Sequence, residues 1–92
     1  PGMTISVLEE YLALKEEHAR EPEPYRLLAI AYRTQEASAK EMGREDVYRA
    51  MKARKNDNIL KYAELKFGKD SYEYKRLKIQ VDRTTVQPVS VP

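Results

Sequence analysis

A chain of 92 residues with 41% hydrophobic and 35% charged side chains can form one modest folded domain and is too apolar for a disordered segment. It has no cysteine, which excludes disulfides, thiolate nucleophiles and Cys-ligated zinc. Residues 1–43 hold five Lys or Arg against eight Glu, a net charge of −3, whereas residues 44–92 hold twelve Lys or Arg against seven acids, a net charge of +5. Such a dipolar surface favours an oppositely charged partner or a second copy of the chain.

The acidic half predicts two helices separated by prolines. Ser6 and Glu9 have capping-box spacing, so a first helix is expected over residues 7–20. The stretch 21–24 contains two prolines, which disfavour helical geometry in the residues before them but are favoured at a first helical position. A second helix is therefore expected over residues 24–42, ended by the glycine that follows.

The basic half predicts shorter elements. A third helix is expected over residues 45–55, and the polar run 56–58 indicates a break, although a helix that continues through it is the alternative. A fourth helix is expected over 58–67, again followed by a glycine. Residues 84–92 carry no charge and two prolines, so they are expected to form an extended tail after a single domain at 1–83.

The segment 71–82 fits two kinds of structure. Leu77, Ile79 and Val81 alternate as in a strand, whereas Asp70 has the spacing of an N-cap before a helix. We favour the helix. The predicted fold is therefore all-α, a small bundle of four to five short helices in which 71–82 is the one segment with a strand alternative.

Residues that could carry catalysis or hold a metal are few. His18 is the only histidine. A zinc site needs four protein ligands, or three protein ligands and a water molecule. The doubled carboxylates at 9–10 and 16–17 are expected on an exposed face, where they do not experience the different environments that acid–base catalysis needs. The three glycines are scattered and form no phosphate loop. We predict no enzyme, cofactor, metal or small-molecule substrate.

The chain shows no sign of a membrane or export segment. Its longest apolar run, residues 27–32, is too short to cross a bilayer, and no basic segment leads into an apolar stretch near the N-terminus. Pro1 and Gly2 before Met3 are interpreted as the remnant of a cleaved tag. The expected location is the cytoplasm.

One string resembles a known DNA-binding motif. Residues 34–43 resemble the first half of a repressor-type helix-turn-helix, in which Ala39 and Gly43 match the Ala-x-x-x-Gly spacing of that family. Residues 44–49 then resemble the start of a recognition helix, while Ser38 stands where the family places a buried Leu. The resemblance implies DNA binding, and no base-contacting role is transferred to individual residues.

The residues expected to bind a partner lie in the basic half, where Lys and Arg alternate with Tyr. Tyr is favoured at interfaces because a large apolar ring carries a polar tip, and the narrow, Ala-rich apolar stripes suggest that a homodimer completes the core. We predict a non-enzymatic interaction module that associates with itself and binds a protein partner. The alternative is a nucleic-acid-binding protein that uses the basic side chains of 44–78. The candidate residues are Arg49, Lys52, Arg54 and Lys55, with Tyr48, Tyr62 and Tyr72.

Overall fold

Helices make up nearly all of residues 4–85, the part of the chain that this computed structural model describes. The predicted all-α class is confirmed, and the strand alternative for 71–82 is wrong, since these residues are almost entirely helical. Within residues 4–85 the structure has no strand and consists of α1 (Ile5–Leu14), the 3-10 helix η1 (Glu16–Arg20), α2 (Pro22–Glu41), α3 (Glu45–Phe67) and α4 (Tyr72–Thr85).

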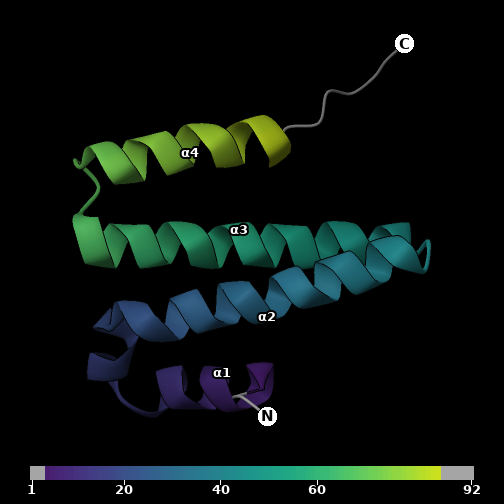
Figure 1. Cartoon of the computed structure of the whole chain (residues 1–92). Coiled ribbons are helices and arrows are strands. Elements are labelled where there is room, and N and C mark those ends of the chain that lie inside the picture. The colour runs from purple at the N-terminus through teal and green to yellow at the C-terminus, as the bar shows by residue number, and fades with distance from the viewer. Residues whose placement is uncertain (1–3, 86–92) are drawn as a thin grey trace.

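The four α-helices form one layer in chain order (Figure 1). α1 packs against α2, α2 against α3 and α3 against α4, while contacts between elements further apart in the chain are sparse. The Cα atoms extend over 46 and 34 Å in two directions and only 18 Å in the third. α1 and α4 are therefore the two margins of the layer, and each has a helical neighbour on one side.

The two long helices form an antiparallel hairpin, which contains the most extensive contact of the molecule. The turn between them is short, and Gly43 adopts a φ of 72°, as expected for a glycine that ends a helix. A side chain early in α2 meets one late in α3, and the reverse holds at the other end. Lys40 lies near Tyr48 and Glu36 binds Lys55, while at the other end Lys66 adds to the effect of Arg26 in lowering the pKa of Glu23.

The core is small and lies mainly between α1, α2 and the middle of α3. Leu8, Leu28 and Tyr32 are buried together, and Met51 packs against them from α3. Several buried residues are alanines, which let helix backbones approach closely. These are Ala29 and Ala39 on α2 and Ala63 on α3.

The first helix starts earlier and ends earlier than predicted. Its N-cap is Thr4, whose hydroxyl accepts from the backbone N–H of Val7 at 3.2 Å, and not Ser6. α1 stops at Leu14, after which the chain forms η1. His18 Nδ1 lies 2.7 Å from the carbonyl oxygen of Tyr11, so a side chain from η1 binds a carbonyl group in the last turn of α1.

The second helix begins at Pro22 and not at Pro24. Both prolines fit in the first turn, because the first backbone N–H groups of a helix have no partner within it and proline lacks that group.

The predicted break at 56–58 is wrong, because α3 continues through it. Asn56 is buried, and Asn58 Nδ2 donates to the carbonyl oxygen of Arg54 at 2.7 Å. The polar side chains are thus accommodated by burial and by a bond to the helix itself, without ending it.

The start of the last helix differs by one residue from the expected cap. Ser71 is the N-cap, since its hydroxyl accepts from the backbone N–H of Tyr74 at 3.1 Å and donates to the carbonyl oxygen of Gly68 at 2.7 Å. Gly68 has a φ of 93° and ends α3, as predicted. α4 runs to Thr85, past the expected start of the tail at residue 84, and residues 86–92 of that predicted tail lie outside the described residues.

Candidate interaction surface

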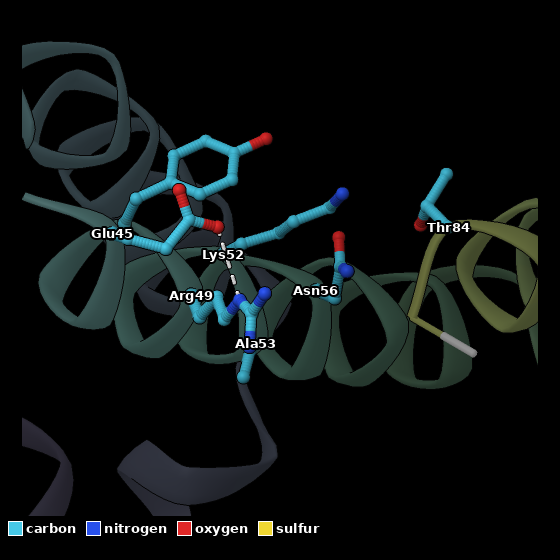
Figure 2. Close-up of a pocket in the computed structure, with 7 residues that line it drawn as sticks. Glu45, Arg49, Lys52, Ala53, Asn56 and Thr84 are labelled. Carbon is cyan, nitrogen blue, oxygen red and sulfur yellow. Dashed lines mark hydrogen bonds and ion pairs between the residues drawn. The ribbon is translucent and has the colours of Figure 1, made fainter. Parts of the chain in front are cut away.

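Three of the seven predicted site residues meet in one hollow on the N-terminal half of α3 (Figure 2). Tyr48, Arg49 and Lys52 line it, and Thr84 from the end of α4 lies across from Asn56. We call this space of about 250 Å³ the α3 hollow. Its full lining is Glu45, Tyr48, Arg49, Lys52, Ala53, Asn56 and Thr84.

Most residues that line the α3 hollow are polar or charged, and they carry more positive than negative charge. Arg49 Nε lies 3.0 Å from Glu45 Oε2, an exposed ion pair of the kind that contributes little to stability. Lys52 Nζ lies 5.8 Å from the centre of the Tyr48 ring, and Lys40 Nζ lies 6.0 Å from it. Because Arg49 and Lys52 outnumber the one carboxylate, the residues that line the hollow have a net positive charge.

The remaining predicted basic residues point elsewhere. Lys55 Nζ binds Glu36 Oε1 at 2.8 Å in the seam between α2 and α3, where their side chains are only 18% and 12% exposed. The guanidinium carbon of Arg54 lies 5.9 Å from the centre of the Tyr32 ring. The hydroxyl of Tyr32 donates to Glu9 Oε2 at 2.9 Å. Lys55 and Arg54 therefore join elements within the chain.

The spacing explains why the basic residues separate. Residues three apart on an α-helix fall about 60° short of a full turn with each step. Successive basic residues at 49, 52 and 55 consequently turn from the α3 hollow into the seam with α2. The two other tyrosines also lie apart from the hollow: Tyr62 packs edge-on to Phe67 with ring centres 6.4 Å apart, and Tyr72 is exposed at the start of α4.

A second hollow, the central groove, was missed by the sequence reasoning. It lies between α2, α3 and α4, has a volume of about 220 Å³ and is lined mainly by apolar and aromatic residues. A contiguous groove of this kind depends on which helices become neighbours, so spacing within one helix does not reveal it. The apolar and aromatic residues that line it are Ala29, Ile30, Ile59, Tyr62 and Leu77, and the basic residues are Arg26, Arg33 and Lys55.

Large apolar side chains also remain exposed across the layer. Four of the seven lie on the two margin helices, and one lines the central groove. They are Val7, Leu14, Ile30, Met42, Phe67, Tyr72 and Ile79.

His18 and its neighbours form a cluster that fastens η1 to α1. The rings of His18 and Tyr11 stack with centres 3.8 Å apart, and the Tyr11 hydroxyl donates to Glu21 Oε1 at 2.7 Å. The hydrogen bond to the Glu21 carboxylate raises the pKa of Tyr11 above its ordinary value. Because a carbonyl oxygen only accepts, the bond to the Tyr11 backbone places a proton on His18 Nδ1.

Over residues 4–85, no group of three or more His, Cys, Asp or Glu side chains is arranged to hold a metal ion. None of the helices in this range combines the length and apolar character needed to cross a bilayer.

Comparison with known proteins gives the family. The family model described as FcpA matches residues 2–91. The chain belongs to the FcpA family. No curated protein and no solved structure matches it. The FcpA match covers all four α-helices, so the layer and its two margins lie entirely within the family region.

Proposed function

We propose that this FcpA-family chain is a non-enzymatic helical module that associates with itself and binds a protein partner through its outer helical surfaces. The observation that carries the proposal is the single layer of helices. Because the layer is thin and its core is small, large apolar side chains stay exposed on α1, α4 and the central groove. Exposed apolar side chains rimmed by polar groups are typical of protein-binding surfaces.

The two sides of the layer carry opposite net charges. Residues 5–20 carry four Glu against Lys15 and Arg20, whereas α4 carries four Lys or Arg against Glu73 and Asp82. Opposite charges on two sides of one molecule favour association with a second copy, or with a partner that has the complementary pattern. The positive α3 hollow extends the basic side of the molecule toward the end of α4.

The geometry gives less support to the nucleic-acid alternative. A helix-turn-helix sets its two helices at about 90–120°, whereas α2 and α3 run antiparallel along their length. Several basic side chains of the second half are also paired with carboxylates of the same chain. These are Arg49 with Glu45, Lys55 with Glu36 and Lys78 with Asp82.

Sedimentation velocity tests the proposal. Between about 1 μM and about 500 μM, a range that covers the affinities of modest interfaces, the weight-average sedimentation coefficient is expected to rise with concentration. A chain that stays monomeric across this range contradicts the self-association.

Fluorescence anisotropy with labelled single- and double-stranded DNA and RNA tests the alternative. Binding that falls about 10³-fold between about 50 and 200 mM salt would replace the proposal with nucleic-acid recognition. We expect no such binding.

A further inference from the structure

The outer faces of the two margin helices carry the same apolar spacing. On α1, Val7 and Leu14 are 46% and 71% exposed, and on α4, Tyr72 and Ile79 are 72% and 56% exposed. Each pair is seven residues apart, which places the two side chains on one face, two helical turns and about 10.5 Å apart along the axis.

A charged residue lies between the apolar residues on each face, and its sign differs. Glu10 lies between Val7 and Leu14, whereas Arg76 lies between Tyr72 and Ile79. Both charged side chains are exposed, and neither forms an ion pair with the described part of the chain. The α1 face therefore reads apolar, acidic, apolar, and the α4 face reads apolar, basic, apolar.

The direction of the helices makes the two faces complementary. α1 and α4 run in opposite directions and occupy the same stretch along the layer (Figure 1). A second copy shifted sideways by the width of the layer would place its α1 antiparallel to α4 of the first, which continues the alternation of helices. In the register that places Arg76 opposite Glu10, the matched spacing also places Tyr72 opposite Leu14 and Ile79 opposite Val7.

We propose that copies of this chain associate head to tail, with the outer face of α4 on one copy against the outer face of α1 on the next. The occupant of each margin is thus a second copy, because apolar spacing, charge and helix direction all match within the same molecule. The inference rests on the proposed self-association and specifies its surfaces. Since the two faces differ, the contact leaves one free margin at each end and produces an open-ended array, unlike the closed homodimer expected from the sequence.

Two blocking variants test this arrangement. Leu14→Arg places a positive charge opposite the basic α4 face, and Ile79→Glu places a negative charge opposite the acidic α1 face. Both positions are exposed, so circular dichroism should show unchanged helix content. Each variant alone is expected to raise the dissociation constant of self-association at least about 30-fold, because a like charge is buried in the contact. Met42→Arg, at an exposed position between α2 and α3, is the matched control and should associate like the original chain.

The decisive sample is an equimolar mixture of the two variants. Leu14→Arg keeps an intact α4 face and Ile79→Glu keeps an intact α1 face, so the mixture should form a one-to-one dimer and nothing larger in sedimentation velocity. A mixture that remains monomeric would overturn the head-to-tail contact, as would variants that associate like the original chain, and in the latter case the proposed function stands. An original chain that is monomeric throughout would remove the proposed function together with the inference.

Discussion

The α2–α3 hairpin and the two margin helices place their apolar and charged residues differently. In the hairpin, Ala29 and Ala39 are buried and the ion pair of Glu36 with Lys55 is largely shielded from water. On α1 and α4, large apolar residues such as Leu14 face solvent, and Glu10 and Arg76 beside them form no ion pair within the described part of the chain. The hairpin therefore buries most of its contacts while the margins leave large apolar side chains exposed, so variants in the two regions should separate stability from the proposed association.

The largest expected loss of stability comes from the core between α1 and the hairpin. Leu28→Ala removes a buried side chain and should lower the free energy of unfolding by about 2–5 kcal/mol, measured by urea denaturation followed by circular dichroism. Leu14→Ala removes the same atoms from an exposed position and should change it by no more than about 0.5 kcal/mol. Equal costs at the two positions would contradict the division of the molecule into a stabilising hairpin and exposed margins.

The next largest loss of stability is expected from substituting the glycines that follow α2 and α3. Gly68 has φ 93° and ψ 150°, a region essentially restricted to glycine, so Gly68→Ala should cost about 1–3 kcal/mol. Gly43→Ala, at a φ of 72° near the left-handed region, should cost about 1 kcal/mol. An added Cβ meets no atom within 4 Å at either site, so both costs come from the backbone. Urea denaturation that ranks Gly43→Ala as the costlier change would contradict this explanation.

A charge exchange sharpens the role of the margins. Glu10→Arg and Arg76→Glu should each weaken self-association about tenfold, because each places like charges opposite one another in the head-to-tail contact. The double variant restores opposite charges and should return the dissociation constant to near its original value. Asp46→Arg, exposed at the start of α3, makes the same change in net charge as Glu10→Arg but away from both margins, and it is the control for that variant in sedimentation velocity. If the double variant is as weak as the single ones, Glu10 and Arg76 do not meet.

The smallest effect concerns the link between α1 and the hairpin. Burial and the hydrogen bond to Glu9 raise the pKa of Tyr32 above its ordinary value of 10.0. This contribution to stability is fully present below about pH 10 and is lost as the pH rises through the raised pKa. Tyr32→Phe should lower the free energy of unfolding by about 0.5–1.5 kcal/mol at neutral pH, and the difference from the original chain should shrink above pH 10.

Urea denaturation at neutral and alkaline pH measures this change. Tyr72→Phe, at an exposed position, should leave the neutral-pH midpoint unchanged. If the stability lost in Tyr32→Phe grows with pH, the pKa of Tyr32 is not raised in the folded chain.

Features that depend on neighbours in the sequence were predictable. The all-α class follows from the helical spacing of apolar residues, and Gly43 and Gly68 end helices because the chain there needs a positive φ. The run 56–58 was misread because its polarity suggests a turn, whereas the fold buries Asn56 and lets Asn58 bond to its own helix.

The candidate surfaces were only partly predictable. Tyr48, Arg49 and Lys52 do share one hollow, but Lys55 turns away because a three-residue step rotates around the helix. Of the margin residues, the sequence singled out Tyr72 alone. Val7, Leu14 and Ile79 were not among the predicted binding residues, and only the order of the helices shows that they stay largely exposed.

The chain-order packing of the helices also has a consequence for how the molecule opens. In such a linear arrangement each helix is stabilised mainly by its immediate neighbours, so α1 and α4, with one neighbour each, should exchange their amide hydrogens through local opening before α2 and α3 do. A second copy bound at a margin supplies the missing neighbour. Raising the protein concentration should therefore slow amide exchange most in the two outer helices, which would then gain their order from assembly.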